Sequence, residues 1–338
     1  MKPLRKHAAN QRQAPPVVVK VDWAPVYELL ISFECFISAR MHPLIDLGPA
    51  WVREVRQALP AASAAQLTRK NTGAAVRHKE GDDDLLMLLA RGCPGQRDAV
   101  GFLRWFADLT AGAAYEVLAP RQPDGDGPRL PRDFAAWRDR LLAMLVAWET
   151  GYFRTLDPAI LSGLRDQAAA LRRRIASVPP LELVEEATNG IVIEPAPEMR
   201  QVTLVPQYHE RPYNQHTAEL GGVLMLYPAD VLATPADLPS TRLLRLTRAL
   251  SDESRLRILR FLASGPSTLT EVARFAGLSQ PTVHHHLSQL RAAGLVRVHF
   301  LVSSPSRYSL RPDALEQLAH QLDAYLHSDS SREESGQA

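Results

Sequence analysis

The sequence predicts an α+β protein, mainly α, made of two domains. Over most of the chain, apolar side chains recur with the 3.6-residue period of amphipathic helices. Shorter β-branched runs, bounded by proline and glycine, indicate a small β-sheet in the N-terminal part and a β-hairpin near the C-terminus. The length of 338 residues exceeds what one hydrophobic core usually needs, and 46% hydrophobic with 22% charged residues is typical of a globular chain.

Five segments follow from these patterns. They are a disordered basic arm at 1–16, an N-terminal domain at 17–228, a linker at 229–240, a C-terminal domain at 241–326 and a disordered tail at 327–338. The arm lacks the hydrophobic centre of a secretory signal. Its cations could add contacts to a nucleic-acid backbone; they are Lys2, Arg5, Lys6 and Arg12. No apolar run approaches the roughly 20 residues that cross a bilayer, so no membrane partner is expected.

The N-terminal domain is expected to be mainly helical. Its helices are predicted at 24–41, 50–59, 82–95, 99–117, 133–152 and 158–177. Pro25 suits the first turn of the first helix, where a missing N–H has no partner to lose. The last two helices are expected to pair antiparallel. Residues 60–80 show little pattern, and 119–131 is a polar, turn-rich loop.

A small sheet is expected to cover these helices. Its strands are predicted at 17–23, 190–195, 200–207 and 221–230. The intervening segment 208–222 is predicted to be a loop that contains His209 and His216. Two interpretations of this loop stay open: it lines a ligand pocket, or its tyrosines and prolines pack locally at the surface.

The clearest motif lies between Thr268 and Leu295, "TLTEVARFAGLSQPTVHHHLSQLRAAGL". Its apolar period gives two short amphipathic helices joined by a tight turn. Gly277 ends the first helix, because glycine adopts the left-handed backbone of a helix exit at little cost. Ser279 is a good N-cap for the second helix, with Pro281 in its first turn. The core-facing stripe of the second helix is Val283, Leu287 and Leu290. A helix-turn-helix needs this arrangement to lay its second helix in the major groove.

The flanking elements complete a winged helix. Upstream, 241–266 predicts two helices with Ser251 as the N-cap between them. Downstream, 295–302 and 307–310 predict the two strands of the wing, joined by a turn. A last amphipathic helix at 312–326 carries an apolar stripe formed by Leu315, Leu318, Leu322 and Leu326.

The pattern "RALSDESRLRILRFLASG…LTEVARFAGLSQPTVHHHLSQLRAAGLV…RYSL" closely resembles ArsR/SmtB-type bacterial transcription regulators. The resemblance covers the C-terminal domain only. It implies a homodimer that binds a two-fold double-stranded DNA operator, usually as a repressor released by a signal, with a C-terminal helix building the dimer. The first helix of the reading pair lacks the cysteines of the metal-sensing members, and the wing is less basic than is usual in the family.

We predict that a polar face of the C-terminal domain contacts DNA. The candidate residues are Ser279, Gln280, Thr282, His284, His285, Ser288, Gln289, Arg291, Arg297 and Arg307. Side chains of the first turns would contact base edges or nearby phosphates: Gln280, Thr282, His284 and His285. The backbone would be held by Ser288, Arg291, Arg297 and Arg307. An alternative for Arg291 is to cap the core. Residues 241–326 carry 11 Arg and no Lys against 6 Asp and Glu, a basic balance that favours binding to phosphates.

Several function classes are not expected. Two cysteines, Cys35 and Cys93, argue against a disulfide scaffold or a cysteine-rich zinc site and fit a reducing cytoplasm. Three consecutive histidines on a helix point about 100° apart and cannot close on one ion, so no metal is predicted. No nucleotide-binding or hydrolase motif occurs, so neither a cofactor nor catalysis is expected.

The sequence therefore predicts a cytoplasmic bacterial DNA-binding regulator, located at the nucleoid when bound to DNA. Repression is the default that the resemblance implies, and activation stays open. The N-terminal domain is expected to sense a non-metal signal, such as a small organic effector. The alternative is an N-terminal domain that serves as a protein-interaction or catalytic module, with the winged helix used for protein contacts.

Overall fold

The computed structural model describes residues 16–68, 82–121, 129–194, 196, 199–235, 237–300 and 305–327. Within these ranges helices dominate, and the strands form two four-stranded sheets. The predicted α+β, mainly α fold class is confirmed. The basic arm, apart from its last residue, and all but the first residue of the tail lie outside the described residues. No helix or strand occurs in the part of the predicted linker that the structure describes.

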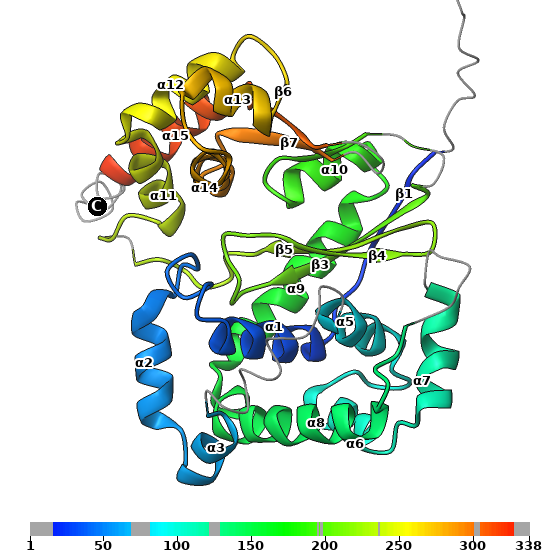
Figure 1. Ribbon diagram of the computed structural model, residues 1–338. Helices are drawn as coiled ribbons and strands as arrows, with labels where there is room; N and C mark the ends of the chain where they lie inside the picture. Colours follow the sequence, from blue (N-terminus) through cyan, green and yellow to red (C-terminus); the bar gives the residue numbers. More distant parts are fainter. Residues whose placement is uncertain are drawn as a thin grey trace, which may run out of the picture.

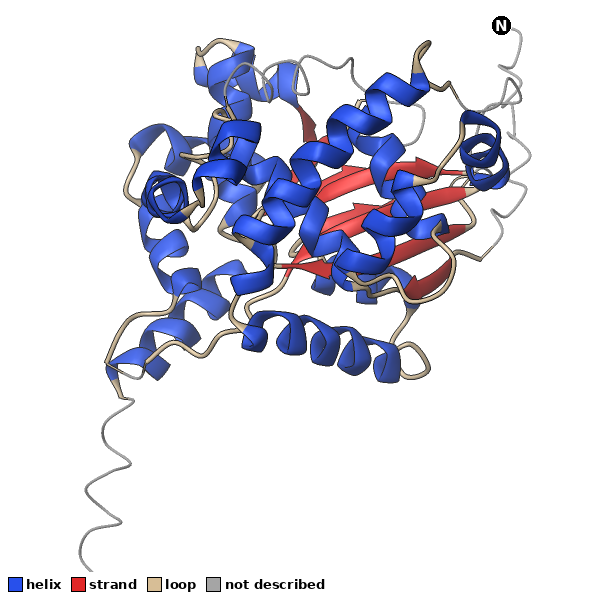
Figure 2. Cartoon of the chain, turned by 90° about the horizontal axis from the view of Figure 1, so that it is seen from below, coloured by secondary structure: helices blue, strands red, loops and turns tan. Residues whose placement is uncertain are grey.

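The N-terminal sheet is sandwiched between two layers of helices (Figures 1 and 2). Its strands run in the order β1 (Val18–Val21), β3 (Gln201–Gln207), β5 (Gly222–Pro228) and β4 (Gln215–Glu219). The first three are parallel, and β4 is antiparallel to β5. Because both faces are covered, β3 and β5 are buried along nearly their whole length, and β5 is apolar throughout, as is usual for buried parallel strands.

Most helices cover one face of this sheet and form the largest core with it. They are α1 (Pro25–Ile37), α2 (Gly48–Ala58), α3 (Ala61–Gln66), α5 (Asp82–Gly92), α6 (Ala99–Ala107), α7 (Ala111–Leu118) and α8 (Phe134–Gly151), with short 3₁₀ turns η1 (Ala119–Arg121) and η2 (Phe153–Thr155). The opposite face packs on α9 (Pro158–Arg174) and α10 (Pro180–Ala187).

The C-terminal domain has the element order of a winged helix. It comprises α11 (Thr241–Leu250), α12 (Glu253–Leu262), β6 (Ser267–Thr268), α13 (Leu269–Ala276), α14 (Gln280–Ala292), β7 (Val296–Phe300), β8 (Arg307–Leu310) and α15 (Ala314–Leu326). A separate core holds these elements together. The wing sheet contains a fourth strand from the N-terminal domain, β2 (Ile191–Ile193), which pairs parallel with β7. The two domains are therefore joined by a β-ladder as well as by the linker.

Several expectations about the N-terminal domain were wrong. The helix predicted at 99–117 is two helices, because Thr110 accepts a hydrogen bond from the Ala113 N–H and starts α7 anew. The helices α8 and α9 do not pair: they lie on opposite faces of the sheet. The predicted loop 208–222 contains strand β4, and α3 and α10 form where no helix was expected.

Two further corrections concern the C-terminal half of the chain. The strand predicted at 190–195 joins the wing sheet as β2 instead of the N-terminal sheet. The N-cap of α12 is Asp252 rather than Ser251, because the Asp252 carboxylate accepts the Arg255 N–H at 2.9 Å. Ser251 instead ends α11.

Candidate nucleic-acid interface

The helix-turn-helix is built by local capping. Thr268 and Glu271 form a capping box at the start of α13, each side chain accepting the backbone N–H of the other. Gly277 leaves α13 with φ of 70°, a conformation that side chains other than glycine adopt at a cost. Ser279 then caps α14 by accepting the Thr282 N–H at 3.3 Å. These contacts fix the angle at which α14 leaves the turn, and Gly277 and Ser279 have the roles that the sequence predicted.

The inner face of α14 is set by its apolar stripe. Val283, Leu287 and Leu290 are buried in the domain core. His286 is partly buried, and burial lowers its pKa. The opposite face of α14 is consequently left for contacts outside this core.

Six of the ten candidate DNA-contacting residues are exposed. They are Ser279, Gln280, Thr282, His284, His285 and Arg307. Five of them lie in the first turns of α14 or at its cap, and Arg307 lies on β8, where its guanidinium donates to the Pro266 carbonyl at 3.4 Å. Gln280 donates to Thr270 on α13 at 3.3 Å, which orders the amide at the tip of the helix pair. The structure thus brings together one free, polar helix tip.

The other four candidates are partly buried: Ser288, Gln289, Arg291 and Arg297. Gln289 accepts a hydrogen bond from Arg255 at 2.6 Å, within the domain. Arg297 forms a 2.5 Å ion pair with Glu185 on α10 of the N-terminal domain. In this conformation the guanidinium that was predicted to hold the DNA backbone is engaged by a carboxylate instead.

Arg291 lies at the interface between the domains and not at the free tip of α14. Its guanidinium carbon lies 5.9 Å from the centre of the Tyr213 ring. Burial lowers the pKa of Arg291, while nearby Tyr213, Tyr308 and Glu210 act in the opposite direction. Neither the predicted phosphate contact nor the core-capping alternative describes this placement.

A cleft separates α14 from the N-terminal domain, with one cavity of about 410 Å³ and another of about 530 Å³. The α14 wall of these cavities contains His284, His285, Ser288, Gln289 and Arg291. The facing wall comes from the segment after α1 and from the β3–β4 loop: Met41, Leu44, Asp46, Glu210, Tyr213 and Asn214. Figure 1 shows α14 lying between the rest of its domain and the N-terminal sheet. The sequence had indicated that the β3–β4 loop could line a pocket, but not that α14 would form the other wall.

A buried polar network holds the β3–β4 loop in place. Glu28 on α1 is fully buried and accepts the backbone N–H groups of Tyr208 and His209, each at 3.0 Å. The His209 ring lies between Glu28 and the Tyr152 hydroxyl, at 2.5 and 2.7 Å. Buried polar groups that are all satisfied fix one geometry, so the loop presents Tyr213 and Asn214 to the cleft from a rigid base. His209 is thus a structural residue and not a ligand contact.

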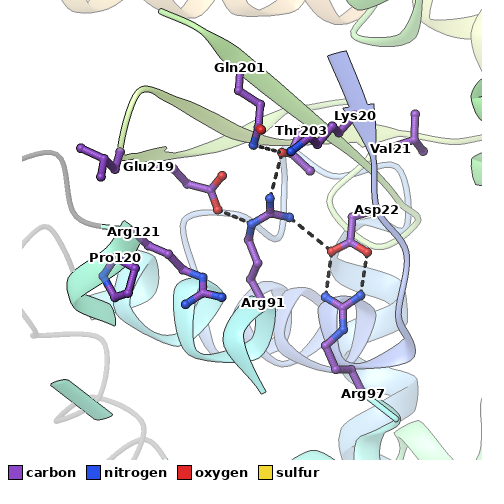
Figure 3. A pocket seen from close by; sticks show the side chains of 11 residues that line it. Lys20, Val21, Asp22, Arg91, Arg97, Pro120, Arg121, Gln201, Thr203 and Glu219 are labelled. Carbon is purple, nitrogen blue, oxygen red and sulfur yellow. Dashed lines mark hydrogen bonds and ion pairs between the residues drawn. The ribbon is translucent and has the colours of Figure 1, made fainter. Parts of the chain in front are cut away.

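A polar pocket of about 550 Å³ lies within the N-terminal domain, at the end of β4 that is remote from the β3–β4 loop (Figure 3). Arg91 donates to Thr203 at 3.1 Å and forms ion pairs with Asp22 and Glu219. Arg97 forms a bidentate pair with Asp22, at 2.7 and 2.6 Å. The wall also contains Lys20, Arg121 and Gln201. Its four cationic side chains outnumber its two carboxylates, so the pocket suits a small anionic ligand better than a cation.

Two kinds of feature do not occur among the described residues. No group of three or more histidine, cysteine, aspartate or glutamate side chains in the described ranges is placed to hold a metal ion. Within the same ranges, every helix is too short or too polar to span a bilayer.

The fold and the capped helix pair define the C-terminal domain as a winged helix-turn-helix. The chain also matches a known family over residues 250–299, that of the helix-turn-helix domain. A "Probable mercury resistance operon repressor" of Streptomyces lividans is 44% identical over 71 residues, which are 20% of this chain and 56% of that protein. The chain thus spans little more than half the length of that relative.

Two solved structures are similar to the same part of the chain. An ArsR-like transcriptional regulator from Rhodococcus is 28% identical, over 28% of this chain and 87% of that one, with a TM-score of 0.24. A homodimeric winged helix-turn-helix DNA-binding domain from Mycobacterium bovis is 25% identical, over 26% of this chain and 83% of that one, with a TM-score of 0.22. The family match over 250–299 confirms the predicted helix-turn-helix domain. The N-terminal domain lies outside this match.

Proposed function

We propose that this protein is a sequence-specific DNA-binding transcription regulator, acting as a homodimeric repressor. The observation that carries the proposal is the exposed tip of α14, where Gln280, Thr282, His284 and His285 point away from the domain core. A recognition helix contacts bases through its N-terminal residues, and amide and imidazole groups suit the donors and acceptors of base edges. The repressor relative from Streptomyces supports the direction of regulation.

The C-terminal helix supports the dimer. Leu315, Leu322 and Leu326 on α15 are 67%, 41% and 64% exposed, while Leu318 packs toward the domain core. Positions 315, 322 and 326 share one helix face. An exposed apolar stripe of this kind is the seam through which two copies of α15 would pack. The domain from Mycobacterium bovis that is similar to this part of the chain is itself homodimeric.

The N-terminal domain is proposed to sense a non-metal signal, and the chain to act by binding and not by catalysis. The polar pocket over β4 supports the sensor role, because it offers uncompensated cations and side-chain donors within a rigid sheet. The buried Glu28 and His209 resemble an acid–base pair, but both side chains are 0% exposed and are used to hold the β3–β4 loop.

The test is binding of the full-length protein to duplexes from the region upstream of its own gene, across a salt series. We expect saturable binding, with affinity falling steeply as salt rises. Gln280→Ala should lower the affinity for the preferred duplex about tenfold or more, since a good base contact contributes about 1–3 kcal/mol. Gln167→Ala, which changes a glutamine that is also exposed but lies on α9, is the matched control and should change nothing. Equal affinities of the two variants would reject the proposed reading face.

The second candidate is that the winged helix serves protein contacts. The pairing of β7 with β2 favours it, because the wing already uses one edge to bind a strand of the N-terminal domain. In the same experiment, weak binding without preference among duplexes would favour this second candidate.

A further inference from the structure

We propose that an acidic face of the N-terminal domain competes with DNA for the winged helix, and that the arrangement seen here is a closed, DNA-excluding state. This inference rests on the proposed function and adds its regulation. The acidic face consists of Asp46, Glu185, Glu194, Glu210 and Asp230. Asp230 is shared between Arg211 of its own domain, at 2.6 Å, and Arg245 of the winged helix, at 3.5 Å. Its partner is the side of the winged helix formed by α11, α14 and β7.

The first argument is that the wing is held by backbone hydrogen bonds. Strand β2 pairs with β7 in a parallel register that places Ile191, Val192 and Ile193 beside Val298, His299 and Phe300. The Val298 N–H donates to the Gly190 carbonyl at 2.8 Å, and the Glu194 N–H donates to the Phe300 carbonyl at 3.2 Å. The β4 residue His216 adds a ring contact with Phe300, with centres 5.3 Å apart. This is a formed ladder, so the contact between the domains is specific.

The second argument is charge. Glu185 pairs with Arg297 at 2.5 Å, and the Glu194 carboxylate lies 3.0 Å from the His299 ring. Asp46 pairs with Arg245 on α11 at 2.9 Å. A cation predicted to hold the DNA backbone, Arg297, is thus bound to a carboxylate in place of a phosphate. The Glu185 carboxylate neutralises the charge that would attract a phosphate and holds the guanidinium against α10, so the ion pair weakens the DNA contact.

The third argument is space. The outward face of α14 from His285 to Arg291 looks into cavities of about 410 and 530 Å³, whose far walls include Leu44 and Tyr213. A recognition helix is surrounded by a major groove about 12 Å wide, with the sugar-phosphate backbones on both sides. The cavities are too small to hold the two sugar-phosphate backbones beside α14. The exposed polar side chains of α14 lie in its N-terminal half, from Gln280 to His285, and Ser288, Gln289 and Arg291 are partly buried, so full insertion of α14 requires the domains to separate.

Closure then sets the apparent affinity. A binding site that is populated for only a fraction of the time loses affinity in proportion to that fraction. A closed form favoured about 100-fold would weaken DNA binding about 100-fold. An effector that binds only the open or only the closed arrangement would shift this balance.

The decisive experiment locks the closed state in the full-length chain. Val192 and His299 are paired across β2 and β7, and neighbouring strands are about 4.8 Å apart, within the Cα spacing of a disulfide. The double variant Val192→Cys/His299→Cys, with its crosslink verified by mass spectrometry, should bind the duplex at least tenfold more weakly when oxidised than when reduced. Each single-cysteine variant should respond to neither oxidation nor reduction. The native Cys35 and Cys93 are both buried.

The converse variant opens the interface. Glu185→Arg should repel Arg297 and raise DNA affinity several-fold. Glu186→Arg is the matched control: it makes the same charge change one residue along α10, where Glu186 pairs with Arg174 inside the N-terminal domain. Both variants gain the same general attraction to DNA. Only the amount by which the DNA affinity of Glu185→Arg exceeds that of Glu186→Arg therefore reports opening of the interface.

The outcomes separate the two proposals. Equal affinities of the locked and reduced proteins, or of the two arginine variants, overturn the competition and leave the DNA-binding function standing. If the reduced double variant and Glu185→Arg bind no duplex at all, the proposed function fails, and the competition fails with it.

Discussion

Asp22, the residue after β1, ties the first strand to the helices beneath the sheet. Its carboxylate accepts hydrogen bonds from both Arg97 terminal nitrogens and from the Tyr27 hydroxyl at 2.6 Å. Burial alone would raise the pKa of Asp22, but these hydrogen bonds outweigh it and lower the pKa to about 2 from the usual 3.8. The folded pKa lies below the unfolded one, so the stabilisation is complete above pH 3.8 and is lost as the pH falls toward 2.

We therefore expect Asp22→Asn to flatten the acid dependence of stability. A depression from 3.8 to about 2 corresponds to about 2 kcal/mol of unfolding free energy. Between pH 5 and pH 2.5, the wild type should lose more stability than the variant by an amount approaching this value. Urea unfolding at each pH measures it. Asp139→Asn serves as the control, because Asp139 is 63% exposed in its pair with Arg138. Identical pH profiles for wild type and Asp22→Asn would contradict the assignment.

At the scale of the element, α15 carries the prediction about assembly. Burying an exposed leucine contributes about 1.5–3 kcal/mol, and a two-fold interface contains each substitution twice. Leu322→Glu should therefore weaken the dimer about 100-fold or more. Ala324→Glu introduces the same charge on the opposite face of α15 and should leave the dimer intact. Sedimentation equilibrium measures both, and a dimer that survives Leu322→Glu would show that another surface forms it.

The helix-turn-helix could be predicted from the sequence because its determinants are local. Gly277 and Ser279 set the turn within a few residues, and the apolar stripe of α14 sets its inner face. The same local rules explain the error at 99–117. The apolar pattern runs across Asp108 and Leu109, but Thr110 supplies a new N-cap, and the cap decides where the helix restarts.

Pairing between distant strands is not written in any local pattern. The segment of β2 has the apolar, β-branched composition of a strand, which the sequence showed, but its partner β7 is about a hundred residues away and was not predictable. The same distinction between local and long-range determinants applies to the candidate DNA-binding site. The exposed tip at Gln280 and Thr282 follows from the face of one helix, whereas the partner of Arg297 is Glu185, 112 positions earlier in the chain.

At the scale of the whole molecule, strand β4 connects the two sites of interest. Its last residue, Glu219, pairs with Arg91 in the polar pocket, and its second residue, His216, contacts Phe300 of the wing strand. The strand is hydrogen-bonded along its length to β5. A ligand that pulled Arg91 away from Glu219 would therefore act on the strand that abuts the wing. This gives the proposed sensor a direct structural connection to the proposed competition.

The competition also makes a prediction about salt. In the wild type, the observed affinity is the affinity of the open form reduced by closure. Salt weakens DNA binding, but it also weakens the ion pairs that hold the closed form. The two effects oppose each other, so the wild-type plot of log affinity against log salt should be shallower than that of an opened protein.

Glu185→Gln tests this with the least change in charge. It removes the partner of Arg297 and frees that guanidinium for a phosphate, which steepens the slope by about 0.9 for one added contact. Its affinity should exceed that of the wild type at low salt and approach it as salt rises, because closure contributes less there. The plot of log affinity against log salt for Glu186→Gln, which carries the same charge change, should run parallel to that of the wild type. If Glu185→Gln also runs parallel, Arg297 makes no phosphate contact when released, and Glu185 does not hold the winged helix away from DNA.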